Sequence, residues 1–232
     1  MVADSTLLRD IRRVYGRRQT RSLSAAKQGL FDTTLERLQI SKDLLDRGNL
    51  TGSDIFGQDY PSFWFEIGFG NGEHLKNEAL AHPETAFFGA EPFINGMAAF
   101  LNSIQKQDDS NIRVYMDDAM TVIDAVADGV LDGIYVLNPD PWPKKRHWKR
   151  RIIQTEHIVK FVRVLKPGGK LVMTTDIDDL AAWMADHAAV HPGMREISTD
   201  RFTPPPGWIP TKYEQKGAAK GRKQTYLVFE RL

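Results

Sequence analysis

Short, continuous apolar runs alternate along the chain with longer segments of mixed polarity. Short, mainly apolar runs of four or five residues are typical of strands buried on both faces of a parallel sheet. The segments between them are long enough for helices that cover those faces. The pattern therefore predicts an α/β fold with a doubly wound, mostly parallel sheet and helices on both faces. The predicted strands are residues 63–67, 86–90, 112–116, 134–137, 170–174 and 226–229, and the predicted helices are residues 73–80, 94–104, 152–165 and 180–189.

The length of 232 residues is sufficient for one α/β domain and short for two. Residues 31–232 are predicted to form that single domain. Residues 1–30 contain few bulky apolar side chains, so we expect a basic, mobile arm there. Between residues 9 and 27 the arm's cations are opposed only by Asp10, and they are Arg9, Arg12, Arg13, Arg17, Arg18, Arg21 and Lys27.

The composition excludes several kinds of chemistry. The chain has no cysteine, which rules out disulfides, thiolate metal sites and a cysteine nucleophile. The six histidines form no clear ligand pattern, so no metal site is expected. The N-terminus has no apolar signal-peptide core, and no apolar run approaches the roughly 20 residues that span a bilayer. We therefore expect a cytoplasmic protein with no membrane partner.

Glycines follow the first predicted strand, at Gly68, Gly70 and Gly72. Glycines allow the backbone to approach a ligand closely at the carboxyl ends of strands, where open α/β sheets bind their ligands. The dinucleotide spacing G-x-G-x-x-G is not met, because Glu73 stands where the third glycine would be. The chain also lacks a G-x-x-x-x-G-K-[ST] motif, which counts against a P-loop nucleotidase.

Acidic residues end the next two predicted strands. Glu91 closes the second strand, where a carboxylate can accept hydrogen bonds from both ribose hydroxyls. Asp117 and Asp118 close the third, where a carboxylate could accept from an adenine amino group. Together with the glycine loop, these acids suit a cofactor with an amino-acid end, a ribose and an adenine. They favour S-adenosylmethionine over a nicotinamide cofactor.

A proline-rich loop leaves the fourth predicted strand, with three prolines in the five positions 139–143. Prolines fix the backbone, so the loop costs little further entropy to hold in place. The loop presents one carboxylate, Asp140, and one indole, Trp142. The loop is either a turn with only a structural role or a rigid active-site loop. An acid and an aromatic ring at the ligand-binding edge of a sheet favour the active-site loop.

Directly after this loop, six of the eight residues 144–151 are basic, with a histidine and a tryptophan among them. Cations interleaved with an aromatic ring are typical of nucleic-acid binding. Further cations gather at residues 212–223, although the whole chain has a net charge of only +1. This polarised layout, beside the candidate active loop, predicts an RNA partner. The N-terminal arm is then either a solvated tail or a second RNA contact.

These motifs in combination resemble tRNA (guanine-N7-)-methyltransferase of the single-chain bacterial type, which modifies a guanine in the tRNA variable loop. The resemblance covers about residues 62–232, and P-D-P-W with its basic tail is the most specific part. It rests on E-I-G-F-G-x-G, G-x-E, D-A, P-D-P-W with a basic run ending R-R-I, T-D and T-K-[FY]-E. It implies a Rossmann-like class I methyltransferase fold, S-adenosylmethionine as cofactor and tRNA as partner. It also implies a monomer or homodimer without an obligate protein partner.

The resemblance assigns roles to individual positions. Asp140 matches the catalytic acid, which also lies beside the cofactor, and the residues expected to bind the cofactor with it are Glu66, Gly68, Gly70, Glu91 and Asp118. The positions expected to bind the substrate are Lys144, Asp176, Thr211, Lys212, Tyr213 and Glu214. The positions expected to contact RNA are Arg146, His147, Trp148, Lys149, Arg150 and Arg151. One departure is Asn138, where many family members carry an aromatic residue.

The expected reaction needs neither a general base nor a metal, because guanine N7 is an acceptor with an in-plane lone pair and no proton. Positioning N7 in line with the methyl group is sufficient. Asp140 is therefore interpreted as a group that orients the guanine or offsets the positive charge of the methylated ring. Asp176 is the alternative for reading the guanine. Lys144 would hold a phosphate or the base O6, and Trp142 would stack on the base or only pack the loop.

Two other functions fit the same fold class, since a fold does not fix a function. One is a nicotinamide-dependent oxidoreductase, against which the glycine spacing and the basic run both count. The other is a non-catalytic RNA-binding protein that retains a methyltransferase fold, against which the acids at the strand ends count.

Overall fold

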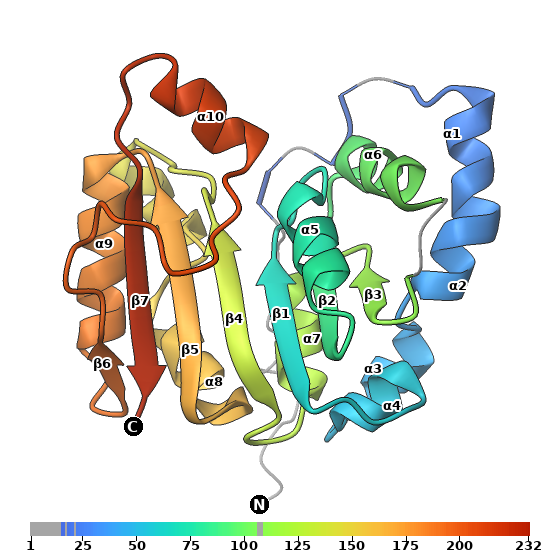
Figure 1. The fold of residues 1–232 in the computed structure, drawn as a ribbon, viewed down its shortest axis with the longest axis horizontal. Helices are drawn as coiled ribbons and strands as arrows, with labels where there is room; N and C mark the ends of the chain where they lie inside the picture. The colour runs from blue at the N-terminus through green and yellow to red at the C-terminus, as the bar shows by residue number, and fades with distance from the viewer. Residues whose placement is uncertain (1–14, 17, 21, 106–108) are drawn as a thin grey trace, which may run out of the picture.

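The structure is a computed structural model, and it describes residues 15–16, 18–20, 22–105 and 109–232. The described residues form a seven-stranded sheet in the order β3-β2-β1-β4-β5-β7-β6 (Figure 1). Neighbouring strands are parallel from β3 to β5, and β7 runs antiparallel between β5 and β6. The strands are β1 Ser62–Ile67, β2 Thr85–Ala90, β3 Ile112–Tyr115, β4 Leu131–Leu137, β5 Leu165–Thr175, β6 Met194–Glu196 and β7 Thr225–Arg231.

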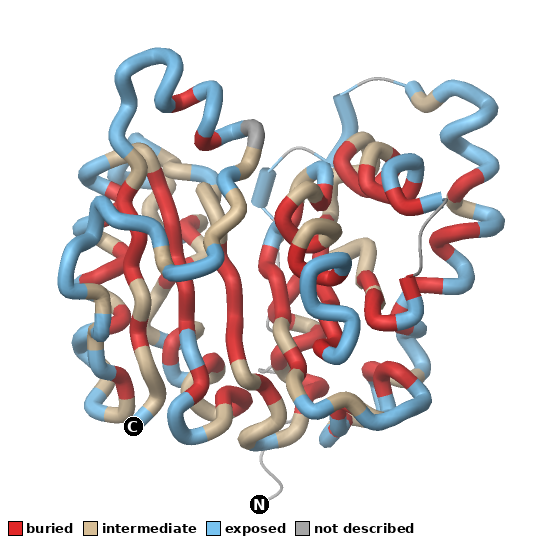
Figure 2. The backbone as a smooth tube through the Cα atoms, in the orientation of Figure 1, coloured by how far each residue is buried: buried red, intermediate tan, exposed pale blue. Residues whose placement is uncertain are grey.

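Two layers of helices cover the sheet, and both interfaces with it are apolar. On one face the buried core lies between the strands and α7, α8 and α9, with α3 and α4 at its edge. On the other face α5, α6 and the run from α1 to α2 pack on the strands, together with the loop that carries Trp208. Figure 2 shows the central strands buried, while α1 and most of α10 are exposed. The helices are α1 Ala25–Leu30, α2 Glu36–Leu38, α3 Lys42–Arg47, α4 Gly52–Phe56, α5 Glu73–Ala81, α6 Ile94–Ile104, α7 Ala119–Ala125, α8 Thr155–Val164, α9 Asp178–Ala189 and α10 Lys212–Ala218, with a π turn η2 Phe31–Leu35 and a 3-10 helix η3 Lys145–Arg150.

The strand order has its topological switch point between β1 and β4. The chain proceeds from β1 outward through β2 to β3, and then returns to the other side of β1 to form β4. The connections that leave the carboxyl ends of β1 and β4 therefore diverge, which opens a crevice at that edge of the sheet. Both the glycine loop and the proline-rich loop begin there.

The predicted fold class is confirmed, and each predicted strand corresponds to an observed one, although the predicted strand 112–116 runs one residue past the end of β3. The elements without a predicted counterpart are α1 to α4 with η2, and α7, η3, β6 and α10. The predicted helix 152–165 begins later, at Thr155, because the residues before it belong to the turn that follows η3.

The proposed limit of the arm at residue 30 falls inside a helical run that continues from α1 through η2 into α2. Ser24 caps α1, and Leu30, Leu35 and Leu38 bury their side chains in the core. α1 also packs against α6. The described end of the expected arm is therefore anchored on the body of the protein. Residues 1–14, 17 and 21 of that arm lie outside the described residues.

Candidate active site

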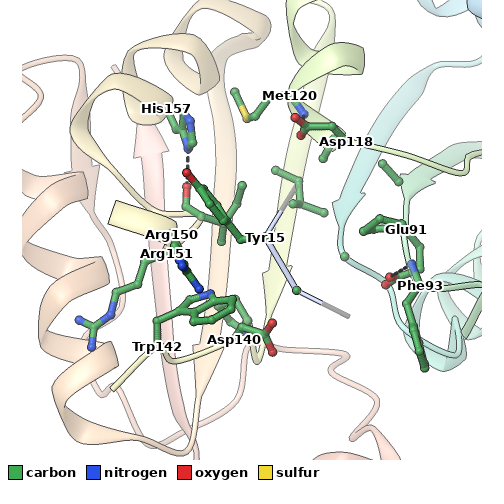
Figure 3. A pocket seen from close by; sticks show the side chains of 18 of the residues that line it. Tyr15, Glu91, Phe93, Asp118, Met120, Asp140, Trp142, Arg150, Arg151 and His157 are labelled. Carbon is green, nitrogen blue, oxygen red and sulfur yellow. Dashed lines mark hydrogen bonds between the residues drawn. The ribbon is translucent and has the colours of Figure 1, made fainter. Parts of the chain in front are cut away.

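A cavity of about 660 Å³ lies in the crevice between the carboxyl ends of β1 and β4 (Figure 3). Its walls come from the N-terminal segment, the glycine loop, the ends of β2 and β3, the proline-rich loop and the stretch that joins η3 to α8. The residues central to the argument are Tyr15, Gly16, Arg18, Gly68, Glu91, Phe93, Asp118, Met120, Asn138, Asp140, Trp142, Lys149 and Arg150.

The glycine loop is held in shape by Glu91. Gly68 and Gly70 have positive φ angles of 70° and 56°, a conformation that favours glycine. One oxygen of the buried Glu91 carboxylate accepts a hydrogen bond from the Gly70 N–H at 2.6 Å, and the other accepts from the Phe93 N–H at 2.8 Å. Burial raises the pKa of Glu91, and the two backbone donors oppose that rise. Glu91 therefore links the loop after β1 to the end of β2 and also faces the cavity.

Two of the predicted cofactor residues, Glu66 and Gly70, do not line the cavity. Glu66 is only 3% exposed, and its carboxylate lies 2.9 Å from the Nδ1 of His74, at the start of α5. Glu66 contacts α5 and Gly70 is held by Glu91, whereas Gly68 and Glu91 line the cavity.

The adjacent Asp117 and Asp118 have different environments. Asp118 lines the cavity and caps α7, accepting a hydrogen bond from the Met120 N–H at 2.9 Å. Asp117 lies outside the lining and pairs with the exposed Arg18 at 2.8 Å. The structure therefore brings Asp118, the one that the resemblance selects, to the cavity.

The proline-rich loop is bracketed by two residues with left-handed backbone conformations, Asn138 with φ 48° and Trp142 with φ 42°. Asn138 donates its N–H to the Thr174 carbonyl at 2.9 Å, and its side-chain oxygen accepts from the Gln224 amide at 2.8 Å. Asp140 lies between the brackets and faces the cavity (Figure 3). Partial burial raises the pKa of Asp140, and within the described residues its carboxylate makes no hydrogen bond. Its acceptor positions are therefore available to a ligand.

The described part of the N-terminal arm crosses the mouth of the cavity. The Ile94 N–H donates to the Arg18 carbonyl at 2.8 Å, and Thr20 donates to the Asn95 side chain at 2.9 Å. Gly16 passes so close to Asp140 that a Cβ there would lie 3.4 Å from the carboxylate. This placement differs from the expected mobile arm. The sequence analysis missed these lining residues because nothing in a basic, weakly apolar segment marks it as docked.

Four cations of the basic run form an exposed surface beside the cavity, and they are Lys144, Lys145, Arg146 and Lys149. His147 and Trp148 are half-buried, and nearby arginine charges contribute with desolvation to lower the pKa of His147. Arg150 lies over the rings of Tyr15 and Trp142, at 5.1 and 5.0 Å from their centroids.

Arg151 departs from the expectation that the whole basic run contacts RNA. Its side chain is only 2% exposed, so it does not face a macromolecule in this structure. The short η3 ends at Arg150, and the chain then turns so that Arg151 points back into the protein.

The substrate positions assigned by resemblance to Asp176 and to residues 211–214 lie outside the cavity lining. The carboxylate of Asp176 is buried and pairs with Arg222 at 2.6 Å, and the Tyr213 hydroxyl donates to it at 3.5 Å. Thr211 and Glu214 form a capping box that starts α10 at Lys212. These residues therefore form a second, separately built cluster, and Lys144 is the only predicted substrate position on the exposed surface of the basic run among the described residues.

Comparison with known proteins identifies the class. Residues 61–227 match the model of a family described as a putative methyltransferase. Among solved structures, the 16S rRNA methyltransferase KamB is similar in fold, with a TM-score of 0.56 and 13% identity over 79% of this chain and 95% of that one. A [4+2]-cyclase, SpnF, is also similar, with a TM-score of 0.52 and 14% identity over 82% and 79%. The fold and the family model together define a protein of the methyltransferase class.

Curated relatives identify the family within that class. A tRNA (guanine-N(7)-)-methyltransferase of Agrobacterium fabrum is 41% identical over 94% of both chains. The enzyme of the same name from Brucella anthropi is 38% identical over the whole of both chains. The chain belongs to the tRNA (guanine-N(7)-)-methyltransferase family.

Two further findings concern other kinds of site. No helix of the described ranges is both long and apolar enough to cross a bilayer. Within the same ranges, no group of three or more histidine or acidic side chains is arranged to hold a metal ion.

Proposed function

We propose that the protein transfers the methyl group of S-adenosylmethionine to N7 of a guanine in the variable loop of tRNA. One observation carries the proposal in this family member. One cavity is bordered by the glycine loop, by Glu91 and Asp118, and by the carboxylate of Asp140, and an exposed basic surface adjoins it.

The residues present fit S-adenosylmethionine. A carboxylate has about four acceptor positions, and two of those on Glu91 are used by backbone N–H groups, so two are left for ribose hydroxyls. Asp118 has one oxygen engaged by its cap and could accept from an adenine amino group. The cavity volume of about 660 Å³ is in the range of small-molecule sites. When bound there, the cofactor supplies an electrophilic methyl group on a sulfonium.

Asp140 is then the residue that orients the guanine. N7 is already nucleophilic, so the protein has no proton to remove from it. The carboxylate, which makes no hydrogen bond to a described residue, can accept hydrogen bonds from the guanine N1–H and amino group, or offset the charge that develops on the ring. Asp176 is less suited to this role, because Arg222 already pairs with its buried carboxylate. The structure therefore supports Asp140 over the alternative considered from the sequence.

The exposed cations of η3 are proposed to guide the RNA backbone toward the cavity. Phosphate contacts by lysine and arginine supply sequence-independent affinity that falls with salt. Trp142 is an unsuitable stacking platform in this conformation, because Arg150 and the edge of His147 both contact its ring. We propose that it packs the loop.

The family resemblance to single-chain bacterial enzymes supports action as a monomer or homodimer, without an obligate protein partner. A tRNA substrate also supports a cytoplasmic location.

The decisive experiment is incubation of the purified protein with labelled S-adenosylmethionine and bulk unmodified tRNA, followed by nucleoside mass spectrometry. We expect 7-methylguanosine as the labelled product. Titration with S-adenosylmethionine and with NAD in parallel separates the methyltransferase from an oxidoreductase on the same fold. A different methylated nucleoside, or cofactor binding without transfer, would contradict the proposal.

A further inference from the structure

Arg151 is the one arginine or lysine with a buried side chain among the residues that the structure describes. It follows five cations of the basic run that are exposed or half-buried. A buried guanidinium is costly unless all its donors and its charge are satisfied. The set of groups that satisfy it here indicates what it does.

Two aromatic rings and one carboxylate enclose the guanidinium. Its centre lies 4.9 Å from the ring of Trp148 and 4.9 Å from the ring of Trp183, and one terminal nitrogen donates to Asp179 at 2.5 Å. The enclosure is itself fixed, because the Trp183 indole N–H donates to the Ile153 carbonyl at 2.7 Å. Arg151 is therefore held between η3 and α9 with little freedom to reorient.

The remaining contact reaches the proline-rich loop. The Nε of Arg151 donates to the Pro141 carbonyl at 2.9 Å, and Pro141 directly follows Asp140. Because prolines lack an N–H, this loop has few backbone donors of its own with which to fix its path. Its first half is held at Asn138 by Thr174 and Gln224. The hydrogen bond from Arg151 holds the second half, so the two attachments bracket Asp140.

We propose that Arg151 is a positioning residue, which fixes the carboxylate of Asp140 in the cavity through the Pro141 carbonyl and does not contact RNA. The inference rests on the proposed function, since it assigns Arg151 a part in the same reaction. Arginine is required there because its planar fork donates to a carbonyl and a carboxylate at once. The delocalised guanidinium also lies 4.9 Å from the centroids of two neighbouring aromatic rings. Lysine keeps the charge and loses that geometry.

The test compares Arg151→Lys with Lys149→Gln, an exposed cation of the same run. For each variant, kcat and KM for tRNA are measured at several salt concentrations, with cofactor binding and thermal unfolding measured separately. A misplacement of about 1 Å costs up to roughly a hundredfold in rate. We therefore expect Arg151→Lys to lower kcat by about ten- to a hundredfold, with KM for tRNA and its salt dependence unchanged. Lys149→Gln should raise KM and reduce the salt slope by about one.

A double-mutant cycle with Asp140→Asn separates positioning from a general structural effect. If Arg151 acts through Asp140, Arg151→Lys should lower kcat no further in the Asp140→Asn background. Additive losses, an unchanged kcat, or a fall in salt slope like that of Lys149→Gln would each overturn the proposal. If Arg151→Lys does not fold, Asp179→Asn, which removes the exposed anchor, replaces it in the same cycle with the same criteria. Failure of the wild-type protein to make 7-methylguanosine would instead refute the proposed function.

Discussion

The left-handed backbone at position 138 suits asparagine, where the family resemblance leads us to expect an aromatic residue. Asparagine adopts positive φ more readily than most other residues with a side chain, and the hydrogen bond from Gln224 holds its amide in place. Trp142 has a conformation that costs of order 1–3 kcal/mol, and its contacts with Arg150 and His147 help to maintain it. Three prolines made a rigid loop predictable, but the chain alone does not reveal which residues absorb the strain at each end.

Asp140→Asn tests the orienting role of the carboxylate. The amide is of similar size and keeps one acceptor, so cofactor binding should be nearly normal. Loss of hydrogen bonds to a charged acceptor is worth about 1.5–3 kcal/mol, so kcat should fall by roughly ten- to a hundredfold. Burial raises the pKa of Asp140 above its ordinary value. The wild-type rate should therefore drop as acidification protonates this group and level off at pH values where the carboxylate is ionised. A rate that rises through neutral pH in the wild type and not in the variant would reveal a general base.

The strands were predictable because each contains a short, mainly apolar run, whereas α10 and β6 lack such a signal. α10 is polar along its length, so only the spacing of Thr211 and Glu214 marks its start as a capping box. The family resemblance assigns Thr211 and Glu214 to substrate binding. In the structure, the same two side chains cap the start of α10. β6 has three residues and depends on β7 for its pairing. Its existence follows from tertiary contacts that no local pattern encodes.

The basic run shows a similar limit. Six cations in eight residues predict one charged surface, but a short 3-10 helix followed by a bend directs Arg151 inward, whereas the other cations are exposed or half-buried. Whether a side chain of this run points inward or outward depends on the position of the bend after η3. The charge pattern therefore predicted that a basic surface exists here, but not which of its cations are exposed.

Charge reversal tests the exposed cations of the basic run, from which Arg151 is excluded. Arg146→Glu and Lys149→Glu are expected to raise KM for tRNA several-fold each and to flatten its salt dependence, because each removes a phosphate-contacting cation. Both side chains are exposed, so the unfolding temperature should change little. The matched control is Lys170→Glu, an exposed lysine near the amino end of the parallel part of β5, which changes net charge equally. Equal effects from all three variants would mean that only net charge matters and that the surface is not an RNA path.

A buried histidine connects parts of the molecule that are distant in sequence. His74, at the start of α5, contacts Glu66 of β1 at 2.9 Å, the ring of Tyr135 of β4 at 4.4 Å and the ring of Trp208 at 5.1 Å. Trp208 in turn donates to Glu214 of α10 at 3.2 Å. The strand behind the glycine loop and the segment that begins α10 therefore share one polar cluster across the switch point of the sheet. The residues of this cluster lie in separate segments of the sequence, and the sheet topology brings them into contact.

The charge of His74 should make the stability of the whole fold depend on pH. His74 is 2% exposed, and burial lowers its pKa, but Glu66, Glu78 and Glu214 oppose this strongly enough that the net direction is upward. Tyr135 also packs on the ring, and it stays protonated because burial and the nearby carboxylates raise its pKa. A histidine whose pKa is raised on folding stabilises the protein fully below its unfolded pKa of about 6.5. That stabilisation is lost as the pH rises through the higher folded value.

His74→Asn should therefore destabilise the protein more at mildly acidic pH than at alkaline pH. Removing one partner of a buried ion pair costs about 3–5 kcal/mol, which sets the expected loss in free energy of unfolding near pH 6. The loss should shrink as the pH rises through the raised folded pKa of His74, because the wild-type imidazole then gives up its proton and no longer pairs as a cation. Urea unfolding of both proteins across this range measures the difference directly. A penalty that is constant or grows with pH would mean that the folded protein holds His74 neutral throughout, and that the three carboxylates around it do not outweigh its burial.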